Sequence, residues 1–176
     1  GYSARMERWP GTDLIELVAR LRAGAGFLSV AREMLDAEAE ASAIDDDALF
    51  PAAEAQSLDR VAAEAELLAW SASGYRVTPF WDVEFPMQLR EIHEMPPLIW
   101  TRGTLLARDD GVCVVGTRNP SAKGRAYAAT VATGLANRNI TVVSGLAAGI
   151  DTVAHTAALD AGGRTVAVIG TGIAQT

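Results

Sequence analysis

Hydrophobic residues recur every three or four positions through the first part of the chain, which is the spacing of one buried helix face. This pattern predicts helices over residues 12–24, 29–41 and 57–74. Gly74 follows the last apolar residue of the third helix, as a helix-ending glycine does. The acidic stretch 43–51 is expected to be a turn or short linker. We therefore predict a small helical, SAM-like domain over residues 1–74.

The pattern changes at Tyr75. Residues 75–103 are extended pieces punctuated by prolines, and 98–103 resembles a short strand. Continuous apolar runs then alternate with helical patterns. They predict strands over 111–116, 140–145 and 164–170 and helices over 121–139 and 150–163. Short strands that are apolar on both faces are typical of parallel sheets covered on both sides. We predict an α/β fold over residues 75–176, a Rossmann-like parallel sheet in a three-layer αβα arrangement.

Each predicted strand ends in a glycine, at positions 116, 145 and 170. Crossovers between parallel strands are right-handed, so the carboxyl ends of all three strands should lie at one edge of the sheet. We expect Gly116, Gly145 and Gly170 to meet there. The sheet stops after its third strand, which is half of a usual doubly wound sheet, so we expect the domain to be truncated.

Composition places the chain among ordinary globular proteins, with 49% hydrophobic residues. It has no apolar run of about 18 residues and no secretory signal pattern, so we expect a cytoplasmic protein without a membrane partner. Cys113, the single cysteine, lies in an apolar strand and is expected to be a buried structural thiol. One cysteine and two histidines leave little material for a metal site.

The net charge of −7 is unevenly distributed. Residues 1–74 hold six arginines against fourteen acidic residues, whereas residues 75–176 hold nine basic residues against eight acidic ones. From Gly111 onward there are five basic residues and two acidic ones. The glycine loops therefore lie in a locally positive segment, which is compatible with a polyanionic ligand.

No glycine loop matches a dinucleotide or NTPase fingerprint in its spacing. Ser144 ends the second strand, where a dinucleotide site would need an acidic residue for the ribose. We therefore predict no cofactor. Arg118 lies two residues beyond a strand end, beside backbone amides, where its planar group suits phosphate. A salt bridge or helix-end contact is an equally good interpretation of Arg118.

Asp151 and His155 are one helical turn apart and share a face. No third ligand or nucleophile stands at a suitable spacing, so we predict neither a metal site nor a catalytic site there. We expect Asp151 to offset the helix dipole, and His155 to pack or to hydrogen-bond to a neighbouring loop.

Four motifs in series resemble one family. The stretches "WDVEFPMQLREIHEMPPLIWTRG", "VVGTRNPSAKG", "VVSGLAAGIDTVAHTAAL" and "GGRTVAVIGTG" are similar in order and spacing to the DNA-processing protein A family (DprA/Smf). The resemblance covers residues 75–176. It implies a Rossmann-like domain that binds single-stranded DNA and helps to load the RecA recombinase during natural transformation, without an established catalysed reaction.

The same resemblance implies that the glycine loops form a positively charged DNA pocket. The DNA-binding residues that it implies are Gly116, Thr117, Arg118, Ser144, Gly145, Gly149, Asp151, Gly170, Thr171 and Gly172. From their charge, we expect the neighbouring Lys123 and Arg125 to face phosphates as well. Ala148 stands where many members carry arginine, so the second loop contributes amides but no charge. The second half of the family's domain, with its surface for homodimer formation and RecA contact, would lie beyond Thr176.

Two other functions remain open. Related Rossmann-like pockets bind nucleotides, so the chain could be a nucleotide sensor or a nucleotide-processing enzyme. Phosphoribohydrolases of this architecture need a catalytic glutamate, and the acids from Gly111 onward are Asp151 and Asp160. A weaker hypothesis is an acidic helical adaptor in which residues 1–74 bind the partner.

Overall fold

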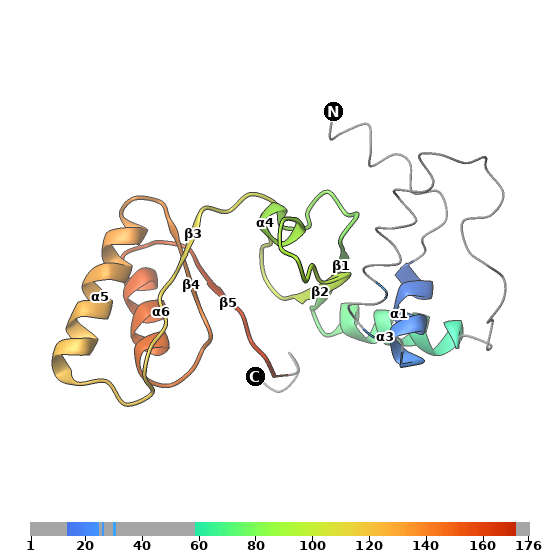
Figure 1. The fold of residues 1–176 in the computed structure, drawn as a ribbon, viewed down its shortest axis with the longest axis horizontal. Coiled ribbons are helices and arrows are strands. Elements are labelled where there is room, and N and C mark those ends of the chain that lie inside the picture. Colours follow the sequence, from blue (N-terminus) through green and yellow to red (C-terminus); the bar gives the residue numbers. More distant parts are fainter. Residues whose placement is uncertain (1–13, 25, 27–29, 31–58, 172–176) are drawn as a thin grey trace. The chain divides into compact units, whose positions relative to one another are not determined.

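The computed structural model describes residues 14–24, 26, 30 and 59–171 (Figure 1). The chain divides into two compact units, Gly1–Arg108 and Asp109–Thr176. Apart from Val30, the predicted helix over 29–41 lies outside the described residues, as do the acidic stretch 43–51 and Gly172. Among the helices that the structure describes, none is long and apolar enough to cross a membrane.

Before the strands of the first unit, the described residues form two helices that pack together, α1 (Leu14–Arg22) and α3 (Arg60–Ala72). α3 begins after Asp59, whose carboxylate accepts the backbone N–H of Ala62 at 2.9 Å and so caps the helix. Beyond its end, Gly74 has a φ of 77°, the left-handed conformation that glycine supplies after a helix. The predicted first and third helices, and the predicted end of the third helix at Gly74, are thereby confirmed.

A hairpin completes the first unit. Strand β1 (Arg76–Pro79) pairs antiparallel with β2 (Leu98–Thr101), and the short helix α4 (Met87–Arg90) lies between them in sequence. Buried side chains of the helices and of the hairpin segment form one cluster, which includes Leu17, Val18, Ala63, Phe80, Phe85 and Leu98. Because the two parts share this core, the compact units divide at residues 108/109, later than the division at 74/75 that the sequence pattern suggests.

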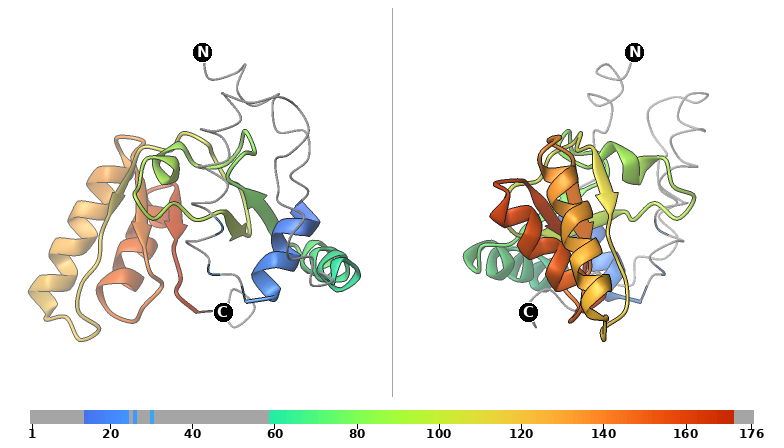
Figure 2. Two further views of the ribbon diagram at one scale, coloured as in Figure 1. Left: turned by 45° about the vertical axis from the view of Figure 1, so that its right-hand side comes forward. Right: turned by 90° about the vertical axis from the view of Figure 1, so that its left-hand side faces the viewer.

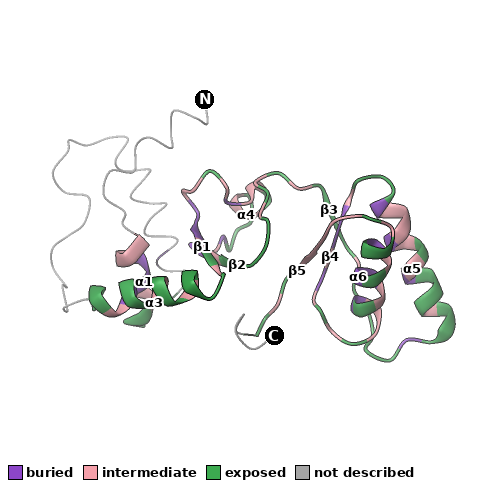
Figure 3. Cartoon of the chain, turned by 180° about the vertical axis from the view of Figure 1, so that it is seen from behind, coloured by how far each residue is buried: buried purple, intermediate pink, exposed green. Residues whose placement is uncertain are grey.

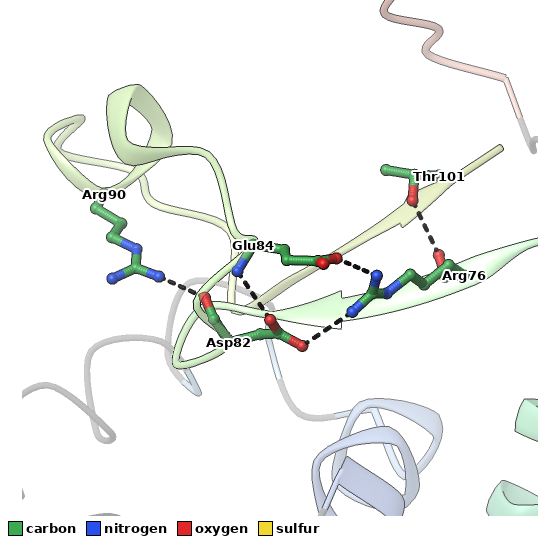
Figure 4. A network of polar contacts seen from close by, with 5 residues as sticks. All are labelled: Arg76, Asp82, Glu84, Arg90 and Thr101. Atoms are coloured by element: carbon green, nitrogen blue, oxygen red, sulfur yellow. Dashed lines mark hydrogen bonds and ion pairs between the residues drawn. The ribbon is translucent and has the colours of Figure 1, made fainter. Parts of the chain in front are cut away.

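The charged side chains around the hairpin are engaged with one another (Figure 4). Arg76 forms ion pairs with Asp82, at 3.4 Å, and with Glu84. Arg90 donates to the backbone carbonyl of Asp82 at 2.5 Å, and Thr101 donates its hydroxyl to the carbonyl of Arg76 at 3.4 Å. These two arginines therefore stabilise the first unit internally.

The second unit is the predicted succession of strands and helices (Figure 1). Strands β3 (Gly111–Cys113), β4 (Thr141–Ser144) and β5 (Thr165–Ala167) form a parallel sheet in that order. Helix α5 (Ala122–Ala136) connects β3 to β4, and α6 (Ile150–Asp160) connects β4 to β5. The α/β Rossmann-like class is thereby confirmed.

Both crossovers step in the same direction across the sheet, so right-handed connections put α5 and α6 on the same face. The two helices pack against each other there (Figure 2). Their contact is built from small residues, and the buried cluster beneath them consists of Ala132, Ala136, Val142, Ala154 and Ala158. Gly163 belongs to the same contact, because a Cβ there would lie 2.4 Å from that of Ala136. Small side chains therefore set how closely the helices approach.

The described residues show two of the three predicted layers, since α5 and α6 cover one face of the sheet. Val114 packs against the helix-side core, so by strand alternation Cys113 and Val115 point to the other face. Val115 is 67% exposed and Cys113 is exposed as well. The prediction of a buried Cys113 is wrong, because β3 is an edge strand that no described helix covers on that face.

Candidate functional site

Two of the three glycine loops pack against each other at the edge where the parallel strands end. Gly149 has a φ of 93° and lies so close to the first loop that an added Cβ would stand 2.3 Å from the carbonyl oxygen of Thr117. Ile150 donates its N–H to the same carbonyl at 3.2 Å. On the first loop, Gly116 leaves room for the Ile150 side chain, because a Cβ at Gly116 would lie 2.7 Å from Ile150 Cγ1. The predicted meeting of these two loops is confirmed.

The third loop leaves the sheet at the same edge. Val168 donates its N–H to the carbonyl of Ser144 at 2.9 Å, which continues the β4–β5 pairing up to this loop. Gly170 and Thr171 are both exposed there. We call this edge, made of residues 116–118, 145–149 and 168–171, the loop rim.

Asp151 is turned into its own loop. It is 6% exposed, and its Oδ2 accepts the backbone N–H groups of Gly145 at 3.1 Å and Ala147 at 3.4 Å. Ser144 is also buried, and its hydroxyl donates to the carbonyl of Val114 at 2.7 Å. Both predicted site residues thus organise the loop rim from inside, and two amides of the second loop are already occupied.

His155 is buried in the same helix. Its Nδ1 lies 2.5 Å from the Thr165 hydroxyl, and that hydroxyl donates to the carbonyl of Val142 at 2.8 Å. The single hydroxyl proton is therefore used, so Nδ1 must carry the proton of the ring and donate it. Burial lowers the pKa of His155, although the carboxylate of Asp151 partly raises it. His155 is buried and hydrogen-bonded, as predicted, but its partner Thr165 lies in strand β5 and not in a loop.

Three basic side chains of the predicted site, Arg118, Lys123 and Arg125, are exposed. Within the part of the chain that the structure describes, no hydrogen bond or ion pair engages any of these side chains. The salt bridge and the helix-end contact considered for Arg118 are therefore not found among the described residues. Nothing in the described part of the chain occupies these three cations.

The other basic residues of the second unit are engaged within the protein. Arg164 forms an ion pair with Asp109 at 2.8 Å. Burial raises the pKa of Asp109, but hydrogen bonds from Thr141 and Arg164 outweigh it and hold this pKa below its ordinary value. Arg138 donates to the carbonyl of Gly134 at the far end of α5, at 2.7 Å. The available charge is therefore concentrated near the start of α5.

Backbone donors accompany these cations. The N–H groups of Gly116, Thr117 and Arg118 have no hydrogen-bond partner among the described residues. α5 begins immediately after this loop, with Ser121 as its cap; the Ser121 hydroxyl accepts the N–H of Gly124 at 3.1 Å. The positive end of a helix and unpaired amides both favour an anion. The first loop and the first turn of α5 can hold a phosphate.

Sequence reasoning missed one residue near this positive region. α5 has an exposed side and a buried side (Figure 3). Tyr127 is 74% exposed and lies one turn after Lys123 in this helix. The signal was present, because residues four apart in a helix share a face. The sequence alone does not show which side of α5 is covered, and an aromatic residue in a helix is more often part of the core.

Comparison with known proteins gives a consistent result. Residues 76–176 match the family described as DNA recombination-mediator protein A. The chain is 48% identical over 90 residues to the DNA processing protein DprA of Streptococcus pneumoniae, a match that covers 51% of this chain and 32% of that protein. It is 34% identical over 108 residues to DprA of Bacillus subtilis, covering 60% of this chain and 36% of that protein.

A solved structure is also similar. The X-ray structure of DNA processing protein A from Streptococcus pneumoniae matches with a TM-score of 0.52 and 31% sequence identity, covering 97% of this chain and 58% of that one. The chain spans about a third of the length of these curated relatives, 32% and 36%. The family match includes the whole described loop rim and covers more than half of the sequence. The chain therefore belongs to the DNA recombination-mediator protein A family.

Proposed function

We propose that this chain binds single-stranded DNA at the loop rim and the adjoining first turn of α5, as part of a protein that acts in DNA processing and recombination. The observation that carries the proposal is the presence of Arg118, Lys123 and Arg125 as exposed side chains without partners among the described residues. Arg118 belongs to the first loop, whose amides are unpaired among the described residues, and Lys123 and Arg125 lie in the first turn of the helix that follows it. Phosphates of a DNA backbone would contact these groups.

A role in binding without catalysis agrees with the burial and hydrogen bonding of the two ionisable side chains near the loop rim. Asp151 is occupied by loop amides, and His155 is buried, so neither is presented to a ligand as a general acid or base. The second loop contributes mainly through its backbone packing on the first loop. This arrangement favours a binding module over the nucleotide-processing alternative.

The test is Arg118→Ala, measured by fluorescence anisotropy with a labelled oligothymidine at several salt concentrations. Each lost phosphate contact lowers the slope of log affinity against log salt by about 0.7 for single strands, so Arg118→Ala should lower it by that amount. Losing a charge-assisted hydrogen bond should weaken binding by about tenfold.

Arg138→Ala is the matched control, since it also removes one arginine charge from the second unit, but just beyond the far end of α5. Affinity and slope should change little for this variant. An Arg118→Ala protein that behaves like Arg138→Ala would overturn the phosphate role. Stronger binding of a mononucleotide than of the oligonucleotide would favour the nucleotide sensor.

We further propose RecA recombinase as the partner, natural transformation as the process, and a homodimer as the form of the whole protein. These proposals rest on membership of the family. They concern the whole protein, and this chain spans only about a third of the relatives' length. The rate at which RecA assembles on single-stranded DNA, with and without the whole protein, tests the partnership. An unchanged rate would contradict it.

A further inference from the structure

The outer side of α5 carries an aromatic ring beside the positive region. Lys123, Tyr127 and Thr130 follow one another at helical spacing, and all three are exposed. They line an open hollow of about 590 Å³ together with Ser121, Gly124 and Ala126. The opposite side of the helix is buried through Ala128, Ala132 and Ala136. The packing of α5 therefore orients the tyrosine ring toward solvent.

Nothing described inside the protein engages this ring. Tyr127 is 74% exposed, and no aromatic or cation–π contact to it is found among the described residues. Large aromatic rings usually contribute their area to a core or an interface. A ring held outward on a well-packed helix is pre-positioned to receive a flat partner.

Charge indicates what kind of partner fits. α5 contains Lys123 and Arg125 but no acidic residue over its fifteen positions. A basic surface with an exposed aromatic ring is the combination that binds single strands, because the cations follow the backbone and the ring stacks on a base. Four helical residues span about 6 Å, so Lys123 and Tyr127 are close enough to engage one phosphate and a neighbouring base.

We propose that Tyr127 is a stacking platform for a nucleobase of single-stranded DNA, next to phosphates held by Arg118 and Lys123. The inference rests on the proposed function and adds a base-contacting site outside the glycine loops. The strand would run from the loop rim onto the outer side of α5.

The test compares Tyr127→Ala, Tyr127→Phe and Tyr127→Trp in the full 176-residue chain. Two oligonucleotides of equal length are used, one with thymine bases and one with abasic sites. Tyr127→Ala should weaken binding of the thymine oligonucleotide by about tenfold, and Phe and Trp should retain it. The salt slope should stay unchanged, because stacking releases no counterions. Affinity for the abasic oligonucleotide should be the same in all four proteins.

Leu159→Ala is the control, since Leu159 is a large apolar residue, 60% exposed, on the neighbouring helix α6. If Tyr127→Ala matches this control while Arg118→Ala lowers the salt slope, stacking is overturned and the proposed function stands. Equal losses on both oligonucleotides would also overturn stacking. If the wild-type chain binds neither oligonucleotide, both proposals fail.

Discussion

Asp151 illustrates how a single side chain changes the chemistry of a glycine loop. The loop "SGLAAGID" has the composition of a phosphate binder, but the Asp151 carboxylate accepts the N–H groups of Gly145 and Ala147. A carboxylate in this position already supplies the negative charge that these two amides favour. The second loop is therefore a support for the first loop, whose amides remain unpaired among the described residues.

His155 makes the stability of this region dependent on pH. Its pKa in the folded protein lies below the ordinary value of 6.5 because of burial. On acidification the unfolded chain therefore takes up the proton first, so the free energy of unfolding should fall as the pH drops through about 6.5. The decrease should end once the pH is below the folded-state pKa.

Urea unfolding at about pH 7.5 and about pH 5 measures this effect. His155→Gln is the comparison, because glutamine does not titrate and can still donate to Thr165. Its free energy of unfolding should vary less between the two pH values than that of the wild type. Equal variation in both proteins would show that other groups cause the pH dependence.

The loops at the edge of the sheet act as one element because of their backbone contact. Gly149 sits against the Thr117 carbonyl, and Ile150 donates to that carbonyl at 3.2 Å. This contact joins residues 32 positions apart in the sequence, as the numbers 117 and 149 show. The position of Arg118 next to this contact therefore depends on a glycine in another loop.

Gly149→Ala should separate the two loops. Gly162→Ala is the matched control, because Gly162 also has a positive φ, 72°, but an added Cβ there meets nothing within 4 Å. The control substitution should lower the free energy of unfolding by roughly 1–2 kcal/mol, from backbone strain alone. Gly149→Ala should lower the free energy of unfolding by about 1–3 kcal/mol more than the control does, since its Cβ also collides with the first loop.

Urea unfolding gives both free energies, and the anisotropy assay shows whether DNA binding changes. Gly149→Ala should also weaken DNA binding, whereas Gly162→Ala should not, because Gly162 lies after α6, away from the loop rim. Equal unfolding free energies for the two variants would contradict the close packing of the loops.

At the scale of the whole molecule, the described residues form two separate cores. One joins α1, α3 and the hairpin through residues such as Leu17, Phe85 and Leu98, and the other lies between α5, α6 and the sheet. The first core crosses the division at residue 74 that the hydrophobic pattern suggests. Residues 75–108 therefore depend on the helices for their burial, and the helices depend on them.

This shared core predicts how fragments behave. A fragment of residues 1–108 should unfold cooperatively in urea, because it retains the complete first core. A fragment of residues 1–74 lacks Phe80, Phe85, Met95 and Leu98 of that core and should unfold without a sharp transition. If the fragment of residues 1–74 unfolded in urea with a transition as steep as that of residues 1–108, the domain boundary would lie at residue 74 instead.

The order of strands and helices, the parallel sheet and the position of the glycine loops followed from the sequence. Side-chain periodicity and turn residues act over a few neighbouring positions, so these features are readable locally. The family motifs of the loop rim were readable for the same reason, because each lies within one strand–turn–helix segment.

Other features depended on which surfaces meet in three dimensions. Cys113 is exposed because both crossovers put their helices on the opposite face, and Asp151 is occupied because its own loop folds back over it. Tyr127 points outward because the alanines across α5 form the packed side. Burial and pairing depend on contacts between distant residues, and hydrophobic periodicity carries no information about which of two apolar surfaces will be covered.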